Sequence, residues 1–190
     1  MKEISLKVNE LFYSIQGEGA NLGMPAVFIR LAGCNLNCPF CDTSHEAYDE
    51  MSISAIKAEV EKYNCPNIIW TGGEPTLQLT DEIVSLFKNY YQCIETNGTN
   101  KAPLGINYIA CSAKASTELL NKNFKEVNEI RLPIKKGDKL PDIGLLPKAT
   151  HYYISPIDVS KENLDYCLQL LAENPLWRLS VQLHKLLGIR

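Results

Sequence analysis

The feature that most constrains the fold is an alternation of short apolar runs with longer amphipathic segments along all 190 residues. The apolar runs are rich in β-branched and aromatic residues, and most end on turn-forming residues, which is typical of strands. They cover residues 26–33, 67–73, 92–98, 108–114, 127–134, 151–156 and 178–183. Between them, three segments have apolar residues at helical spacing and predict helices over 53–63, 80–91 and 160–174. We expect Thr80 to be the N-cap of the second helix and the third helix to start at Ser160.

This alternation predicts a parallel α/β sheet. A closed eight-fold barrel typically needs about 250 residues, and no linker divides the chain. We therefore expect a single domain over residues 1–190, built as an incomplete, open parallel α/β barrel. In parallel α/β folds the ligand site lies at the carboxyl ends of the strands. Chemically unusual residues fall at the carboxyl ends of five of the predicted strands, in segments 34–44, 71–75, 95–98, 111–114 and 155–158.

The composition places limits on partners and location. With 45% hydrophobic and 22% charged residues the chain resembles an ordinary globular protein, and a net charge of -3 makes a nucleic-acid binder unexpected. The charged beginning, "MKEISLKVNE", has no long apolar run, so we expect no signal peptide, no membrane span and a cytoplasmic location. Thiols stay reduced there, so clustered cysteines indicate metal binding or catalysis rather than disulfides.

Three of the seven cysteines are crowded into eight residues, "CNLNCPFC", as Cys34, Cys38 and Cys41. A 4Fe–4S cluster is normally held by four thiolates. With three, one iron keeps open positions that could bind a cofactor or substrate. The same thiols could instead bind zinc together with His45, or could be core residues that lie close by chance.

The cysteine spacing resembles the CxxxCxxC signature of the radical S-adenosylmethionine (radical SAM) superfamily, with Phe40 just before the last cysteine. "TGGEP" at 71–75 resembles the GGE motif of that superfamily. The resemblance implies a shortened radical SAM fold and a 4Fe–4S cluster on Cys34, Cys38 and Cys41. It also implies S-adenosylmethionine (SAM) on the open iron, and an electron donor such as flavodoxin.

A narrower resemblance extends along most of the chain. "SIQGEG", "WTGGEPTLQ", "IETNGT", "CSAK" and "VQLHKLLGIR" are similar to segments of the 7-carboxy-7-deazaguanine synthase family of queuosine biosynthesis. The implied enzyme is a carbon–nitrogen lyase that converts 6-carboxy-5,6,7,8-tetrahydropterin to 7-carboxy-7-deazaguanine with loss of ammonia. The resemblance further implies magnesium as a cofactor and a homodimer.

The same resemblance implies residue roles. Thr43 would bind magnesium. SAM would contact Phe40, Cys41, Asp42, Gly73, Glu74, Ser112, Ala113, Lys114, Ser155, Pro156, Ile157 and Asp158. The pterin would contact Ile15, Gln16, Gly17, Glu18, Arg30, Thr71, His184 and, through its terminal carboxylate, Arg190.

The chemistry of several of these side chains suits the implied ligands. The amide of Gln16 and the carboxylate of Glu18 match the mixed donors and acceptors of a pterin edge, although "QGEG" could also be a simple polar turn. The planar guanidinium of Arg30 matches a substrate carboxylate, although it could also form a surface ion pair. At Gly73 the missing side chain allows close backbone approach.

Two other functions remain open at this point. An activase that generates a glycyl radical on a partner protein would share the cysteine and GGE motifs, but would need a protein-docking surface. A zinc-stabilised or electron-transfer protein could use the same thiols without cleaving SAM. The segment 137–147, rich in Pro and Gly, could be a mobile lid or an ordered connection.

Overall fold

The computed structural model describes residues 3–190, which form two compact units. The first contains the chain up to Gln16, Gly23–Thr96 and Ala102–Ile109, and the second contains Gly17–Leu22, Asn97–Lys101 and Ala110–Arg190. The expectation of one domain over 1–190 therefore stays a prediction.

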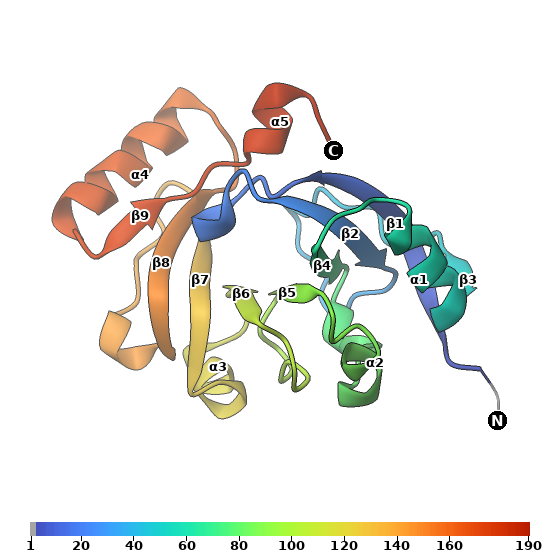
Figure 1. Cartoon of the computed structure of the whole chain (residues 1–190). Coiled ribbons are helices and arrows are strands. Elements are labelled where there is room, and N and C mark those ends of the chain that lie inside the picture. Colours follow the sequence, from blue (N-terminus) through green and yellow to red (C-terminus); the bar gives the residue numbers. More distant parts are fainter. Residues whose placement is uncertain (1–2) are drawn as a thin grey trace. The chain divides into compact units, whose positions relative to one another are not determined.

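The first unit contains a sheet with the strand order β3-β1-β2-β4-β5 (Figure 1). Its strands are β1 (Ser5–Ile15), β2 (Pro25–Leu31), β3 (Asp49–Ser52), β4 (Asn67–Gly72) and β5 (Tyr91–Thr96). β2, β4 and β5 run parallel, as predicted, and they bury the apolar runs of the sequence. β1 is antiparallel to both β2 and β3, and neither β1 nor β3 was predicted.

Two helices and a 3-10 turn complete the first unit. They are α1 (Ile53–Glu61), α2 (Asp81–Ser85) and η2 (Pro75–Leu77). Ser52 caps α1 by accepting the Ala55 N–H at 3.2 Å, and Thr80 caps α2 through the Ile83 N–H at 3.3 Å. The helix predicted over 80–91 is wrong in length, because tight turns follow Ser85 and Tyr91 already pairs with Asn67 in the sheet.

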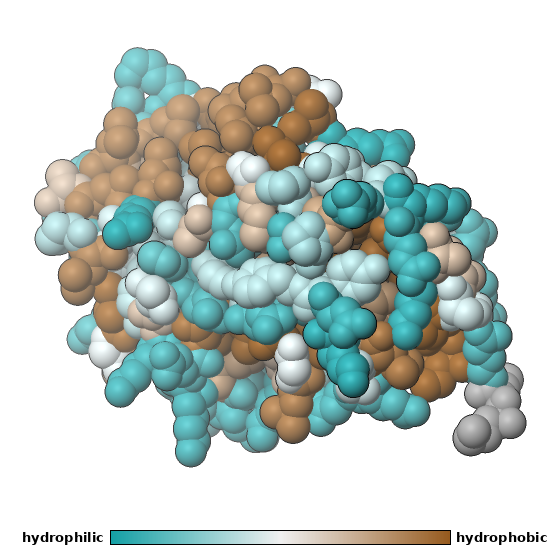
Figure 2. All heavy atoms as spheres, viewed as in Figure 1, coloured by the Kyte–Doolittle hydropathy of each residue, from teal (hydrophilic) through white to brown (hydrophobic). Residues whose placement is uncertain are grey.

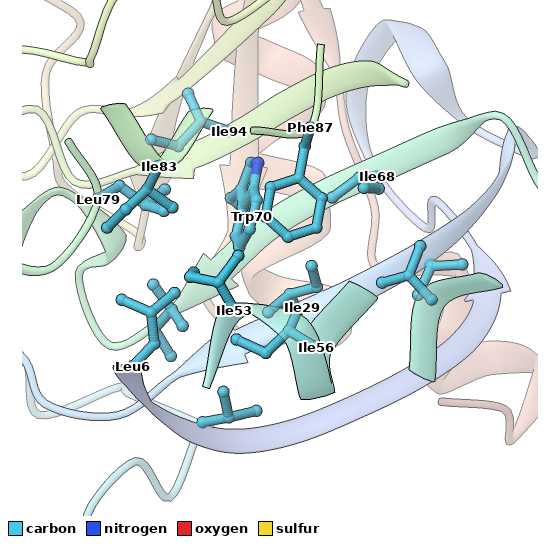
Figure 3. Packing of buried hydrophobic residues seen from close by; sticks show 14 of the residues in the cluster. Leu6, Ile29, Ile53, Ile56, Ile68, Trp70, Leu79, Ile83, Phe87 and Ile94 are labelled. Atoms are coloured by element: carbon cyan, nitrogen blue, oxygen red, sulfur yellow. The ribbon is translucent and has the colours of Figure 1, made fainter. Parts of the chain in front are cut away.

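The core of the first unit lies between its sheet and these helices (Figure 3). Trp70 of β4 is fully buried, and its ring meets that of Phe87 edge-on with centroids 5.1 Å apart. The indole N–H donates to the side-chain oxygen of Gln92 at 2.9 Å, so the one polar atom of this side chain is satisfied. Ile29, Ile56 and other aliphatic residues fill the space around the ring.

The second unit continues the parallel arrangement, with the strand order β6-β7-β8-β9. Its strands are β6 (Tyr108–Ser112, of which Ala110 onward belongs to this unit), β7 (Glu126–Ile134), β8 (Lys148–Pro156) and β9 (Trp177–Leu179). Its helices and 3-10 turns are η1 (Gly19–Asn21), α3 (Thr117–Asn123), η3 (Ile143–Leu145), α4 (Lys161–Glu173) and α5 (Leu183–Leu187). α4 packs on β8 and β9 (Figure 1).

Two sequence predictions fall in this unit. The helix predicted over 160–174 is confirmed as α4, which is the longest helix among the described residues. The strand over 178–183 is wrong in length: β9 ends at Leu179, and Leu183 begins α5. The chain leaves the ladder because the Leu183 N–H donates to the carbonyl of Gly17 instead, at 2.9 Å.

The segment 137–147 is held by hydrogen bonds within the second unit. Asp142 caps η3 through the Gly144 N–H at 2.8 Å, and the Tyr166 hydroxyl of α4 donates to the carbonyl of Asp138 at 2.7 Å. Leu146 is buried. These contacts favour an ordered connection between β7 and β8.

Within residues 3–190 the strands of each unit form an open set, with β3 as the end strand of the first unit and β9 as the end strand of the second. The open parallel α/β class is therefore confirmed. No helix within residues 3–190 is long and apolar enough to cross a membrane.

Candidate functional site

The cysteine loop follows β2 and has no regular helix or strand over residues 32–48. Its three cysteines are free thiols, with Cys34 and Cys38 half-buried and Cys41 exposed. The Cys41 N–H donates to the carbonyl of Cys38 at 3.0 Å, which curls the chain between the last two thiols. Accessible free thiols are the donors that iron–sulfur clusters use, so the donor set fits a cluster. Within residues 3–190 no three metal-ligating side chains already converge, so cluster binding would have to gather the sulfurs.

The GGE turn at the end of β4 is joined directly to the beginning of this loop. The Gly73 N–H donates to the carbonyl of Leu31 at 3.1 Å, and the Glu74 N–H donates to that of Gly33 at 2.9 Å. A Cβ on Gly72 would overlap the Leu31 backbone, and one on Gly73 would overlap the Gly33 carbonyl. Gly72 also has a φ of +141°. The glycines are thus required by backbone contact with the cysteine loop.

The carboxylate of Glu74 is completely buried. Its Oε1 accepts the Thr76 N–H at 3.1 Å, the Thr76 hydroxyl at 2.5 Å and the Thr96 hydroxyl at 2.9 Å. Glu74 therefore caps η2 and ties the end of β4 to the end of β5. Its contact with the SAM ammonium group stays a prediction.

One face of the first sheet carries the polar residues expected to bind substrate. Arg30 and Thr71 are partners in the parallel register of β2 and β4, so their side chains leave the same face. The Arg30 guanidinium lies 3.5 Å from the carboxylate of Glu10 and 5.8 Å from the ring centre of Phe12. Both partners come from β1, so the unpredicted antiparallel strand orients the predicted arginine.

Glu95 is a polar residue of the first unit that the sequence analysis did not select. The amide of Gln16 donates to its carboxylate at 2.7 Å. Glu95 lies near the carboxyl end of β5, directly after the buried Ile94. Its place at the end of a strand is the signal that could have identified Glu95 as a site residue. The polar character of this segment is explained equally well by the Asn-Gly turn that follows.

The predicted magnesium ligand lies beside the last cysteine. The Thr43 hydroxyl donates to the carboxylate of Asp42 at 3.3 Å, and the Cys41 thiol donates to the Thr43 carbonyl at 3.6 Å. The Phe40 side chain is exposed. These are local contacts, so the roles of Phe40, Asp42 and Thr43 stay predictions.

In the second unit the predicted SAM-binding segments begin within the last residues of β6 and β8 and extend beyond them. The Lys114 N–H donates to the carbonyl of Asn97 at 3.2 Å, which brings the "CSAK" and "ETNG" segments together. In the 155–158 segment, the carboxylate of Asp158 accepts the Ser160 N–H at 2.9 Å. The Ser160 side chain and then its backbone N–H lower the pKa of Asp158 below its ordinary value by hydrogen bonding. The SAM contacts of Ser112, Ala113, Ser155, Pro156 and Ile157 stay predictions.

Three residues predicted to bind substrate meet in the second unit. Gly17 has its carbonyl bound by α5, and the imidazole of His184 lies so close to it that a Cβ there would overlap the ring. The carboxylate of Glu18 accepts from the Arg131 guanidinium at 2.9 Å and from the Gln182 amide at 3.2 Å. Arg190 follows Gly188, whose φ of +65° ends α5.

Arg131 and Gln182, which hold Glu18, were not selected from the sequence. Both lie far from it along the chain. Gln182 falls within the family-like segment "VQLHKLLGIR", but only His184 and Arg190 of that segment were assigned a role. Arg131 lies inside β7 within "VNEIRLPI", a stretch that reads only as a strand.

Known proteins resemble this chain along most of its length. A family model described as the radical SAM superfamily matches residues 28–170. A 7-carboxy-7-deazaguanine synthase of Bacteroides thetaiotaomicron is 42% identical over 97% of this chain and 98% of its own length. The synthase of Haemophilus influenzae is 38% identical over 98% of this chain and 95% of its own. The crystal structure of QueE from Escherichia coli matches with a TM-score of 0.72 at 24% identity, covering 95% of each chain, which shows a shared fold.

Proposed function

The chain belongs to the radical SAM superfamily and, within it, to the family of 7-carboxy-7-deazaguanine synthases, and from that premise we propose that it forms 7-carboxy-7-deazaguanine from 6-carboxy-5,6,7,8-tetrahydropterin. The reaction contracts the pterin ring and releases ammonia, a step of queuosine biosynthesis. The observation that carries this proposal is the identity of 42% over nearly the full length of both chains. The cysteine loop by itself would indicate only the superfamily.

The cofactors of the family are a 4Fe–4S cluster and SAM. When bound, they supply a one-electron reductive cleavage of SAM and hence a carbon-centred radical that abstracts hydrogen, with the electron coming from an external donor. The zinc and electron-carrier alternatives lose their basis, since membership of the family accounts for three thiols without a fourth. Which donor supplies the electron, flavodoxin or another, stays a prediction.

The residues of the first unit have separate tasks in this proposal. Cys34, Cys38 and Cys41 would hold the 4Fe–4S cluster through their thiolates. The glycines of the GGE turn allow the backbone to lie close to the cysteine loop, as the hydrogen bonds from Gly73 to Leu31 and from Glu74 to Gly33 support. Arg30 binds the substrate carboxylate in a two-pronged contact, and its pairing with Glu10 and Phe12 supports a fixed orientation.

Other residues recognise the pterin edge and assist the cofactor. Glu18 accepts hydrogen bonds from N–H groups of the substrate. The two donors that orient its carboxylate, Arg131 and Gln182, support this role. Thr43 contributes an oxygen to magnesium, which commonly keeps waters and borrows oxygens from its substrate. The segments Ser112–Lys114 and Ser155–Asp158 contact SAM, as the family resemblance implies.

The proposal also covers assembly and location. We infer a homodimer, supported by exposed apolar residues on α5 and just beyond it, namely Leu186, Leu187 and Ile189. Figure 2 shows hydrophobic surface over α5 and over part of α4. A cytoplasmic location is supported by thiols that must be reduced to bind iron.

The test is a single-turnover assay on protein purified without oxygen and reconstituted with iron and sulfide. SAM, dithionite, magnesium and 6-carboxy-5,6,7,8-tetrahydropterin are added, and mass spectrometry looks for 7-carboxy-7-deazaguanine. We expect product from the wild type and none from Cys34→Ala, Cys38→Ala or Cys41→Ala. Cys65→Ala, a buried thiol away from the loop, is the matched control and should keep its cluster.

The other outcomes are equally informative. Formation of 5′-deoxyadenosine without 7-carboxy-7-deazaguanine would leave the radical chemistry intact and refute the substrate. Failure to cleave SAM with a fully loaded cluster would refute the proposed reaction altogether.

A further inference from the structure

Two charged residues are buried next to one another on β7. Glu129 and Arg131 are two positions apart, so their side chains leave the same face of the strand. Their side chains are only 2% and 5% exposed, and the Arg131 Nε lies 2.6 Å from the Glu129 Oε1 in a close ion pair. The proposed reaction assigns neither residue a task.

Glu129 also binds the backbone of the segment Gly17–Leu22. Its Oε2 accepts the Ala20 N–H at 2.8 Å. Gly19 has a φ of +69°, and a Cβ there would overlap the Glu129 carboxylate. The Gly19 N–H donates in turn to the hydroxyl of Ser180 at 3.0 Å. The carboxylate of Glu129 therefore fixes the turn that follows Glu18.

Arg131 binds the side chain of Glu18 itself. Its Nη1 donates to the Glu18 Oε2 at 2.9 Å, while the Gln182 amide donates to Oε1 at 3.2 Å. The two oxygens of one carboxylate are thus held by donors from two different parts of the fold. The Glu18 side chain is 19% exposed, whereas Arg131 behind it is 5% exposed. The chain of contacts runs from a buried pair to a partly accessible carboxylate.

A buried charged network of this kind is weak evidence for a role in stability alone. Desolvating one cation and two carboxylates is costly, and well-packed apolar residues of similar volume commonly serve the fold as well. A network of this kind does fix geometry, because a planar guanidinium holds its N–H donors in a rigid fork, whereas an ammonium is a compact charge on a flexible stem.

We propose that Arg131 and Glu129 are positioning residues for substrate recognition, which hold the Glu18 carboxylate in the orientation that accepts the N–H donors of the 2-amino-4-oxopyrimidine edge of the substrate. This inference rests on the proposed function. It assigns the buried pair to binding of the pterin, and it predicts no role for the pair in binding SAM.

The test measures equilibrium binding to the reconstituted holoenzyme without oxygen and without reductant, so that no turnover occurs. Dissociation constants are measured for 6-carboxy-5,6,7,8-tetrahydropterin and, separately, for SAM. For Arg131→Lys we expect the substrate Kd to rise about 10- to 100-fold, as for loss of an oriented hydrogen bond to a charged group. The Kd for SAM should stay within about two-fold of the wild type. In turnover, KM should rise more than kcat falls.

Two further variants keep the test decisive. Glu129→Gln retains the shape and an acceptor for the Ala20 N–H, and should raise the substrate Kd by a smaller factor than Arg131→Lys does. Arg178→Lys, at an exposed position of β9, is the control and should bind both ligands as the wild type does. Thermal unfolding of each variant identifies any that fail to fold.

A double-mutant cycle shows whether Arg131 acts through Glu18. If it does, Arg131→Lys should add little to the loss already caused by Glu18→Gln, because residues acting as one unit are not additive. Additive losses, an unchanged substrate Kd in Arg131→Lys, or equal losses for substrate and SAM would each overturn the inference. Absence of product from the wild type would instead refute the proposed function, so the two failures are distinguishable.

Discussion

At Gly73 the end of β4 runs so close to the cysteine loop that no side chain fits between them. The contact consists of backbone hydrogen bonds to Leu31 and Gly33, and the Cβ of Cys34 lies on the same side. A motif associated with cofactor binding is therefore also a packing requirement of the protein chain. The two roles are compatible, because the same contact brings the GGE backbone to the residue that begins the cluster loop.

Gly73→Ala tests this packing role. Its Cβ would overlap the Gly33 carbonyl, so one of the two segments must move, at a cost of about 1–3 kcal/mol. We expect less iron per chain after reconstitution and a lower urea midpoint, measured by tryptophan fluorescence. Gly144→Ala is the control, because its Cβ would meet only the Asp142 carboxylate at 3.3 Å. Equal iron content and equal midpoints in both variants would contradict the packing argument.

At the scale of elements, local capping decides where helices begin, while contacts elsewhere decide where they end. α4 begins at Ser160, whose hydroxyl accepts the Asn163 N–H at 3.3 Å, as its sequence predicts. α2 also begins at its predicted cap, Thr80, yet it ends after Ser85 because Tyr91 belongs to β5. The beginning of α2 is thus set by a single side chain. Its end depends on a strand, β5, whose first residue Tyr91 pairs with Asn67 of β4.

The beginning of α4 carries a prediction about pH. Ser160 caps the helix and also lowers the pKa of Asp158 through hydrogen bonds to the charged carboxylate. A lowered pKa contributes stability above the unfolded-state pKa, and that contribution is lost as the pH falls through the folded-state pKa. Ser160→Ala should therefore cost about 1 kcal/mol at pH 7 from the lost cap. The difference from the wild type should shrink at acid pH, where Asp158 is protonated.

Urea unfolding of the cluster-free protein, followed by far-ultraviolet circular dichroism at neutral and acid pH, measures this difference. Ser85→Ala is the control, since the hydroxyl of this exposed serine donates to the carbonyl of Glu82 and neither caps α4 nor contacts Asp158. A gap between wild type and Ser160→Ala that stays constant with pH would show that Asp158 takes no part.

At the scale of the whole molecule, the exposed apolar residues bear on assembly. Single exposed leucines are normal on a protein surface. Leu186, Leu187 and Ile189 differ because they are 63%, 55% and 42% exposed within four consecutive positions. Contiguous apolar surface of this kind is commonly covered in an assembly.

The homodimer is tested by light scattering during gel filtration of the holoenzyme over a series of concentrations. We expect a mass twice the 21.3 kDa of one chain, and partial dissociation on dilution only if the interface is weak. A mass of one chain at every concentration would refute the homodimer and leave the apolar residues of α5 without this explanation.

The sequence by itself determined those features that depend on neighbouring residues: strands, the cysteine loop and the starts of helices. The seven predicted strands are all present, Cys34, Cys38 and Cys41 lie in an irregular loop after β2, and α2 and α4 are capped by the residues at their predicted starts, Thr80 and Ser160. Short-range periodicity and capping depend on neighbouring residues, so they can be read along the chain. β1 was missed because a shift of register between Val8 and Glu10 breaks the alternation of buried and exposed residues along the strand.

Only the tertiary structure decided how the site residues are held. Arg131 is 113 positions from Glu18, and Gln182 is 164 positions from it. No local pattern encodes such pairs, since a buried arginine in a strand looks like any other strand residue until the opposite carboxylate is placed. The same holds for Glu10, which meets Arg30 through the antiparallel pairing of β1 with β2. The functional side chains can therefore be identified from local sequence, but their orientation depends on contacts between distant residues. A buried charge is stable only beside an oppositely charged or hydrogen-bonding partner, and the tertiary fold decides which partner that is.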